Sequence, residues 1–166
     1  MVFESAKLQP DSPFCALVDK AGQCKISGLS YAGEVSPEEA FDYISVNPSI
    51  LVDVRTVPEW QFTGMPNLAG TPSKLLTVSW KIYPSFAQNP KFIDELTANP
   101  SVQTDTPLFF ICRSGGRSLD AAVEITAAGY KYCFNVTGGF EGDTDESGHR
   151  GKKQGWKYSN LPWIQG

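Results

Sequence analysis

The chain has 166 residues, of which 41% are apolar and 19% are charged, and its formal net charge at neutral pH is −4. That length suits a single domain that buries roughly 70% of its unfolded surface. A mildly acidic chain without a cluster of Lys or Arg argues against nucleic acid and anionic membranes as partners. No apolar run approaches the roughly 20 residues of a membrane span, and residues 1–10 lack the pattern of a secretory signal. We therefore expect a cytoplasmic protein.

The cysteines exclude some kinds of site. They are Cys15, Cys24, Cys112 and Cys133. No two of them form a Cys-x-x-Cys pair, and the single histidine, His149, is far from all of them in the sequence. A zinc site needs four ligands at closer spacing, so we expect neither a metal nor a cofactor. In a reducing compartment the thiols stay free, which leaves the question of which thiol is chemically distinct.

The N-terminal part gives weak structural signals, and the segment after it gives strong ones. Residues 1–33 mix Pro, Gly, Ser and charges without a period, which predicts a loosely organised arm with a short strand around residues 15–18. A helix is predicted from Ser36 to about Val46, because Ser36 is a suitable N-cap and Glu39 completes a capping box with it.

Four short apolar runs predict strands, and two further amphipathic segments predict helices. The predicted strands are residues 50–54, 75–80, 107–111 and 133–136. The predicted helices are one opened by Asn89-Pro90 and ended by Asn99-Pro100, and one from about Arg117 or Ser118 to Ala128 with Gly129 as its C-cap. Strands that alternate with helices indicate an α/β fold, with a central, mostly parallel sheet flanked by helices on both faces.

Cys112 occupies the place where parallel α/β sheets bind ligands, the turn from the end of a buried strand into the next helix. Gly115 and Gly116 lack Cβ atoms, so the backbone can curl and direct successive N–H groups inward as an anion-binding nest. The helix N-terminus adds a partial positive charge, and Arg113 and Arg117 add guanidinium groups. Each feature favours the thiolate of Cys112, which is the nucleophilic form of a cysteine.

The same loop resembles the active-site loop of the rhodanese homology domain. Residues 112–118, Cys-Arg-Ser-Gly-Gly-Arg-Ser, match that family's C-x-x-G-x-R-S pattern. Further motifs follow in the family's order, with Asp-Val-Arg at 53–55, Glu-Trp at 59–60, Gly-Gly at 138–139 and a closing Trp…Leu-Pro at 156–162. The resemblance implies a rhodanese-like three-layer sandwich and sulfurtransferase activity.

The resemblance also implies roles for individual residues. Cys112 is expected to take a sulfane sulfur from a small donor such as thiosulfate and to pass it, through a persulfide, to a thiophilic acceptor. The acceptor is cyanide in an assay, and a thiol or a sulfur-accepting partner protein in a cell. Asp53 and Arg55 are expected to hold the neighbouring loops through an ion pair or hydrogen bonds, with direct contact to the substrate as the alternative. The residues expected to bind the anionic substrate are Arg113, Ser114, Gly115, Gly116, Arg117 and Ser118.

Two departures separate this chain from the family pattern. Residues 64–70 lack the histidine that the family carries there; that residue is normally structural, so we expect little loss of chemistry. Residues 141–155 are a loop insertion within the expected domain of residues 34–166. The insertion either borders the active site and restricts which donor or acceptor can enter, or it is a solvated surface loop. His149 within it is expected to be a surface or structural group, because a preformed thiolate needs no base.

Two other functions compete with sulfur transfer. Cysteine-dependent phosphatases and arsenate reductases resemble this site, but they space Cys and Arg six positions apart to wrap a tetrahedral oxyanion. Here Arg117 is five positions after Cys112, which gives a narrower cradle better matched to one sulfur atom. A non-enzymatic persulfide carrier or partner-binding domain needs the same thiolate, so the sequence does not separate it from an enzyme.

The remaining cysteines and the tryptophans carry simpler expectations. Cys133 begins its strand and Cys112 ends the preceding one, so about 13 Å separates them in parallel neighbours, beyond the roughly 7 Å limit for a disulfide. A resolving cysteine would therefore have to be Cys15 or Cys24. The tryptophans, expected in the core or in a lid, are Trp60, Trp80, Trp156 and Trp163.

Overall fold

The computed structural model describes residue 19 and residues 30–166. The strand expected around residues 15–18 and the thiols of Cys15 and Cys24 lie outside the described residues. Gly33–Val35 forms β1, the first strand of the described residues, where the arm was expected to meet the domain. A strand of three residues is too short to give a readable alternation of polar and apolar side chains, so the sequence did not reveal it.

A five-stranded parallel sheet forms the centre of the protein, in the order β1-β8-β7-β2-β4. The other four strands of this sheet are β2 (Ile50–Asp53), β4 (Lys74–Thr77), β7 (Leu108–Ile111) and β8 (Cys133–Val136). Because all neighbours run parallel, the carboxyl ends of the strands meet at one edge of the sheet, which we call the carboxyl edge, and their amino ends meet at the opposite amino edge. This arrangement confirms the predicted α/β class with a parallel central sheet.

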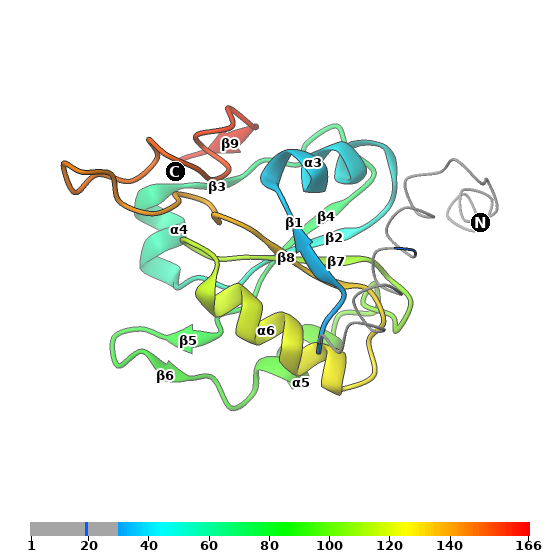
Figure 1. Ribbon diagram of the computed structural model, residues 1–166. Helices are drawn as coiled ribbons and strands as arrows, with labels where there is room; N and C mark the ends of the chain where they lie inside the picture. The colour runs from blue at the N-terminus through cyan, green and yellow to red at the C-terminus, as the bar shows by residue number, and fades with distance from the viewer. Residues whose placement is uncertain (1–18, 20–29) are drawn as a thin grey trace.

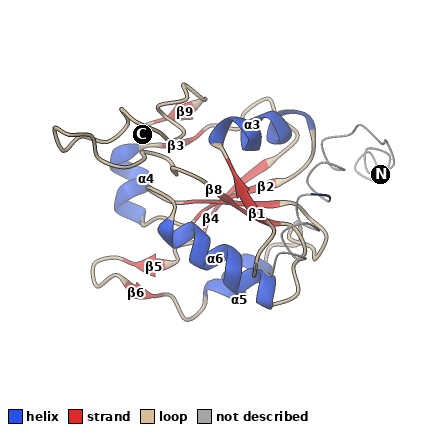
Figure 2. Cartoon of the chain, in the orientation of Figure 1, coloured by secondary structure: helices blue, strands red, loops and turns tan. Residues whose placement is uncertain are grey.

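Helices cover both faces of the sheet. Figures 1 and 2 show α3 (Pro37–Val46) on one face, and α5 (Phe92–Thr97) and α6 (Gly116–Ala127) on the other. α3 begins as predicted, because the Glu39 N–H donates to Ser36 Oγ at 3.1 Å and the Ser36 N–H donates to Glu39 Oε2 at 2.7 Å. The three layers are therefore helix, sheet and helix.

Strand β7 supplies side chains to both buried layers. Phe109 and Ile111 belong to the cluster under α3, whereas Leu108, Phe110 and Cys112 belong to the cluster under α5 and α6. This division follows from the two-residue repeat of a strand, in which successive side chains point to opposite faces. Cys112 therefore continues the alternation of β7 and faces the α6 side of the sheet.

The remaining elements are short and were not predicted. α4 (Val57–Thr63) follows β2, and β3 (Met65–Pro66) pairs with β9 (Trp163–Ile164) in an antiparallel ribbon. A hairpin of β5 (Lys81–Ile82) and β6 (Ala87–Gln88) extends from the sheet below α4 in Figure 1. None of the helices in the described residues is long and apolar enough to cross a membrane.

Two predicted elements are wrong at their boundaries. The strand expected over 75–80 is Lys74–Thr77, because its partner β2 ends at Asp53, which pairs with Thr77. The helix expected to open at Asn89-Pro90 begins at Phe92 instead. Asn89 closes the hairpin, since its N–H donates to the Trp80 carbonyl at 2.8 Å while its Oδ1 accepts from the Lys91 N–H at 3.0 Å. The Asn89 carbonyl also accepts from the Phe92 N–H at 3.2 Å, so Asn89 closes a turn over residues 90–91, and the helix begins only after that turn.

The tryptophans divide between core and surface. Trp80 and Trp156 are buried, at 5% and 0% exposure, as the core expectation requires. Trp60 on α4 is half-buried. Trp163 lies on β9 and is 40% exposed, where it packs edge-on against the Phe140 ring.

Candidate active site

Cys112 directly follows β7, at the point where the carboxyl edge of the sheet meets the N-terminus of α6. Its side chain is only 1% exposed. Gly115, the N-cap of α6, has φ +115°, a left-handed conformation that glycine adopts without a steric penalty. The chain between Cys112 and Gly115 therefore turns back within three residues, and the backbone can approach the sulfur.

Two hydrogen-bond donors converge on the Cys112 sulfur. The Gly115 N–H lies 3.1 Å from Sγ, and the hydroxyl of the fully buried Ser118 lies 3.2 Å from it. Donors of this kind and the N-terminus of a helix stabilise negative charge on a sulfur. Ser114 and Gly116 complete the turn but have no described contact with the sulfur. Of the predicted loop, Gly115 and Ser118 are thus the residues that the structure brings to Cys112.

Arg117 is held by a carboxylate from α4. Its Nη1 and Nη2 donate to Glu59 Oε2 and Oε1 at 2.9 and 2.7 Å, and Glu59 Oε2 also accepts from the Thr56 N–H and hydroxyl. Burial raises the pKa of Glu59, but the hydrogen bonds from Arg117 and Thr56 outweigh burial and lower that pKa to about 2. Burial lowers the pKa of Arg117, but Glu59, with smaller contributions from Cys112 and Asp53, raises it overall. Sequence analysis gave Glu59 no role of its own.

A second ion pair is completely buried at the same edge. Arg55 Nη2 and Asp53 Oδ2 are 2.6 Å apart, and both side chains have no exposed surface. Arg55 also donates to Thr63 Oγ1 at 2.7 Å and to the Gly64 carbonyl at 2.8 Å, and its guanidinium lies 4.3 Å from the centre of the Phe140 ring. The pair thus connects the end of β2 to the end of α4 and to the segment after β8, which is the kind of support that the resemblance implied.

The double glycine at 138–139 lets the segment after β8 pack against the backbone of the Cys112 loop. The Cys112 carbonyl accepts from the Phe140 N–H at 2.8 Å, and the Arg113 carbonyl accepts from the Glu141 N–H at 3.0 Å. Gly139 has φ +62°, and a Cβ at that position would lie 2.5 Å from the Cys112 carbonyl oxygen. A larger residue than glycine would push this segment away from Cys112.

An open cavity of about 590 Å³ borders the loop at Arg113 and Arg117, and Cys112 is not among the residues that line it. It is lined by Glu59, Thr63, Lys81, Phe86, Arg113, Arg117, Glu141 and Arg150. Arg150 belongs to the insertion and is steadied by donating to the Gly142 carbonyl at 2.6 Å. His149 is exposed and does not line this cavity. Since Glu59 is already paired with Arg117, the cationic side chains outnumber the remaining carboxylate, and the mouth of the cavity favours anions.

The amino edge of the sheet carries the second described thiol. Cys133 pairs in register with Leu108, at the start of β7, whereas Cys112 follows the end of that strand. This register confirms that the two cysteines lie at opposite edges of the sheet, and both are free thiols. Burial raises the pKa of Cys133 to about 12, only partly offset by a hydrogen bond with Thr126.

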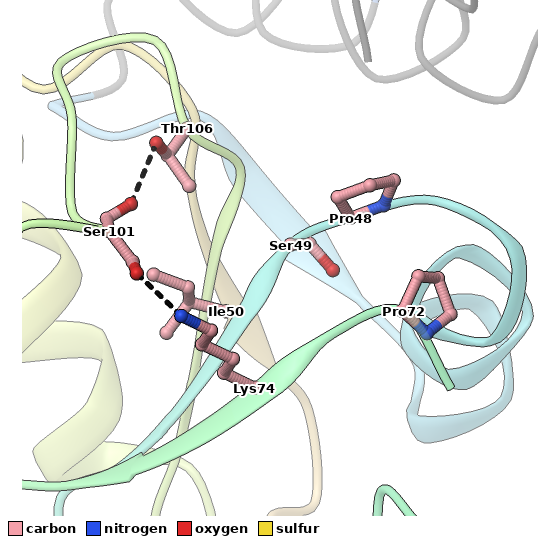
Figure 3. A pocket seen from close by; sticks show the side chains of 7 residues that line it. All are labelled: Pro48, Ser49, Ile50, Pro72, Lys74, Ser101 and Thr106. Atoms are coloured by element: carbon pink, nitrogen blue, oxygen red, sulfur yellow. Dashed lines mark hydrogen bonds between the residues drawn. The ribbon is translucent and has the colours of Figure 1, made fainter. Parts of the chain in front are cut away.

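The amino edge also has a small cavity of about 220 Å³, drawn in Figure 3. It is lined by Pro48, Ser49, Ile50, Pro72, Lys74, Ser101 and Thr106. Its single charged side chain, Lys74, donates to Ser101 Oγ at 2.8 Å. The lining offers no nucleophile of the kind found at the carboxyl edge. Among the described residues, no group of three His, Cys, Asp or Glu side chains could hold a metal ion.

Sequence analysis also missed a polar pair on β8 and β1. Asn135 Nδ2 donates to Glu34 Oε2 at 2.9 Å and to the Gly115 carbonyl at 3.2 Å, and Asn135 Oδ1 accepts from the Ser118 hydroxyl at 2.6 Å. A signal was available in the sequence, because Asn135 places an amide in the buried run Cys133–Val136. Buried amides need several hydrogen-bond partners and so mark polar networks.

Comparison with known proteins places this fold and loop in a family. The sequence profile of the STR4 middle domain matches residues 32–166. The chain belongs to the STR4 middle-domain family. It is 40% identical over 126 residues to an uncharacterised protein of Rickettsia rickettsii, covering 75% of this chain and 91% of that one.

The solved and named relatives agree with this assignment. Rv0390 from M. tuberculosis is 38% identical, and its crystal structure matches this STR4 middle-domain fold with a TM-score of 0.73 over 82% of this chain and 99% of that chain. A protein of Oryza sativa subsp. indica named THYLAKOID RHODANESE-LIKE is 30% identical over 133 residues, which are 80% of this chain and 25% of that protein. The predicted membership of the rhodanese-like family is confirmed, and so is the rhodanese-like α/β fold.

Proposed function

We propose that this protein is a sulfurtransferase that moves a sulfane sulfur through a persulfide on Cys112. The observation that carries the proposal is the convergence of the Gly115 N–H and the Ser118 hydroxyl on a buried sulfur, beside the permanently charged Arg117. Groups fixed in this way stabilise charge on the sulfur without having to reorganise during the reaction.

The reaction has two steps that balance in atoms and charge. In the first, the Cys112 thiolate attacks the outer sulfur of thiosulfate; the donor's S–S bond breaks, sulfite leaves with the electron pair, and a Cys–S–S⁻ persulfide remains. In the second, cyanide attacks the outer sulfur of the persulfide; the bond to Sγ breaks, thiocyanate leaves, and the thiolate returns. The Gly115 N–H and the Ser118 hydroxyl stabilise the negative charge that returns to Sγ in this second step. Such a scheme gives ping-pong kinetics.

The cavity supports an anionic donor. Lys81, Arg113 and Arg150 line it together with the paired Arg117, and Glu141 is the one carboxylate of the lining that is not bound to Arg117. A dianion such as thiosulfate is attracted to this mouth by the excess of positive charge. A volume of about 590 Å³ leaves room for a larger acceptor, including a cysteine side chain presented by a partner protein.

The oxyanion-transfer alternative has less support. A guanidinium that binds a tetrahedral oxyanion presents both of its terminal nitrogens to the ligand. In this protein both terminal nitrogens of Arg117 already donate to Glu59. A persulfide carrier differs from an enzyme in turnover, so the experiment below includes the acceptor step.

The test is intact-mass measurement of the full chain after incubation with thiosulfate, followed by cyanide. We expect a gain of one sulfur on the wild type, its loss as thiocyanate on adding cyanide, and no gain on Cys112→Ser. Repeated turnover by cyanide supports an enzyme, whereas a single discharge that only a protein thiol completes supports a carrier. A wild type that gains no sulfur from thiosulfate would refute the thiosulfate reaction.

A further inference from the structure

Both hydrogen-bond donors that reach the Cys112 sulfur are bound by one side chain. Asn135 Nδ2 donates to the carbonyl of Gly115 at 3.2 Å, and Asn135 Oδ1 accepts from the hydroxyl of Ser118 at 2.6 Å. Asn135 itself is 3% exposed and lies on β8, the neighbour of β7 in the sheet. One buried amide therefore contacts both Gly115, whose N–H faces the Cys112 sulfur, and the Ser118 hydroxyl, which faces the same sulfur.

Glu34 on β1 determines which way this amide points. Its Oε2 accepts from Asn135 Nδ2 at 2.9 Å, and an ionised carboxylate accepts hydrogen bonds but does not donate them. The NH₂ of Asn135 must therefore face Glu34 and the Gly115 carbonyl, and its oxygen must face Ser118. Tyr31 donates to the other oxygen of Glu34 at 2.5 Å and fixes that carboxylate in turn.

The Ser118 hydroxyl carries one proton and has two acceptors, Asn135 Oδ1 at 2.6 Å and Cys112 Sγ at 3.2 Å. Hydrogen bonds to an ionised acceptor are roughly twice as strong as those between neutral groups. When Sγ is negative, as in the thiolate, the hydroxyl turns to the sulfur. When Sγ carries no charge, as in a thiol or in the inner sulfur of a persulfide, the hydroxyl turns to Asn135 and its lone pair faces the sulfur.

We propose that Asn135, oriented by Glu34, is a positioning residue that holds the Gly115 N–H and the Ser118 hydroxyl at the Cys112 sulfur. For its catalytic meaning this inference rests on the proposed function, because only a reaction at Cys112 uses the two donors. The role belongs to the β1–β8 side of the sheet, away from the cavity mouth where Arg113 and Arg150 lie.

The substitution Asn135→Asp tests the proposal with a predictable sign. Asp cannot donate to the Gly115 carbonyl when ionised, and its oxygen holds the Ser118 proton more strongly than an amide does. Both changes disfavour the thiolate, so the Cys112 reactivity profile moves to higher pH. Asn135→Asp also adds one negative charge beside Glu34, which by itself disfavours a thiolate, and the double variant with Glu34→Gln restores the net charge. The other charged groups around Cys112 are unchanged: Asp53, Arg55, Glu59, Arg113 and Arg117.

The measurement is the rate of iodoacetamide labelling of Cys112 in the full chain, followed from about pH 5 to about pH 10 by mass spectrometry of the peptide that contains Cys112. For Asn135→Asp we expect labelling about tenfold slower below the wild-type midpoint, which corresponds to a shift of about one pH unit. Asn47→Ala is the matched control, since Asn47 is 5% exposed and lies before β2 at the amino edge. It is expected to lose stability without moving the profile.

The double variant Glu34→Gln with Asn135→Asp separates positioning from structural support. The amide introduced on β1 can donate to the carboxylate introduced on β8, so we expect the free energy of unfolding to recover while the profile stays at high pH. The proposal is overturned if Asn135→Asp labels like the wild type, if Asn47→Ala shifts the profile equally, or if the double variant restores the profile together with stability. Labelling needs no sulfur donor, so a failure of persulfide formation would refute the proposed function without deciding this test.

Discussion

The two edges of the parallel sheet hold two buried, free cysteines in different surroundings. Cys112 at the carboxyl edge is 1% exposed and receives hydrogen bonds from Gly115 and Ser118. Cys133 at the amino edge is 0% exposed, and burial raises its pKa to about 12. Burial is common to both cysteines, so it does not account for the difference in their surroundings. What differs is that a helix N-terminus and two donors face the Cys112 sulfur, and parallel strands place helix N-termini at one edge only.

Substitution of each cysteine by serine tests this comparison most directly and has the largest expected effect. Cys112→Ser is expected to reduce thiosulfate:cyanide transfer to the background rate, because no other described thiol faces the donors. Cys133→Ser is expected to keep the wild-type rate per folded molecule while losing some stability, because it buries a more polar group at a position that is 0% exposed. Transfer rates and urea unfolding of the two variants check both statements. Equal loss of transfer in both variants would contradict the assignment of Cys112.

The charged side chains provide a second contrast between the edges. Asp53→Asn is expected to lower the free energy of unfolding by about 3–5 kcal/mol, because it leaves Arg55 buried without its partner charge. Lys74→Ala at the amino edge removes a single exposed hydrogen bond to Ser101 and is expected to change stability by less than about 0.5 kcal/mol. Urea denaturation at neutral pH measures both. Similar values for the two variants would refute the difference.

Glu59 makes the free energy of unfolding depend on pH in the acid range. Its pKa falls from 4.5 in the unfolded chain to about 2 in the fold, so its contribution is fully present above about pH 4.5 and is lost as the pH falls through about 2. After allowance for solvent screening of this half-buried pair, the contribution at neutral pH is on the order of 2 kcal/mol. We expect Glu59→Gln to be less stable than the wild type at pH 7, and the gap to narrow in this acid range. Urea unfolding from pH 7 down to about 2 measures it, and a gap that stays constant would contradict the prediction.

Substitution of Arg150 has the smallest expected effect, and it tests whether the insertion contributes to donor binding. Arg150→Ala is expected to raise KM for thiosulfate about two- to fivefold with little change in kcat, as for one solvent-screened charge at the cavity mouth. The effect should fade at high salt. Lys152→Ala is the control, because Lys152 is an exposed cation of the same insertion that does not line the cavity. If both variants raise KM equally, the insertion acts only through its net charge.

The sequence predicted the elements whose signals are local. The capping box at Ser36, the buried run at 108–111 and the glycine turn after Cys112 each appear as expected, because neighbouring residues determine them. The helix expected from Asn89-Pro90 begins at Phe92, after a turn over residues 90–91. The hairpin that Asn89 closes depends on its bond to Trp80, and local patterns do not reveal such partners.

The candidate site divides in the same way. Cys112 and its loop are contiguous in the sequence, so their residues were predicted together. Glu59, Asn135 and Glu34 come from α4, β8 and β1, and they reach the loop only when the chain folds. A lone amide in a buried strand is a usable signal, but its partners depend on strand order, which the sequence did not supply for β1.

The bonds at the base of the insertion have a consequence for how this protein can evolve. The carbonyls of Gly139 and Phe140 accept from the N–H groups of Trp156 and Lys157, and the Phe140 N–H in turn donates to the Cys112 carbonyl. The insertion is thus closed at its root, next to the backbone of Cys112. A lineage can lengthen or shorten the outer part of this loop, or change its charges, while the surroundings of Cys112 stay unchanged. Under the proposed function, donor preference is therefore free to change in evolution without a change in the chemistry at the sulfur.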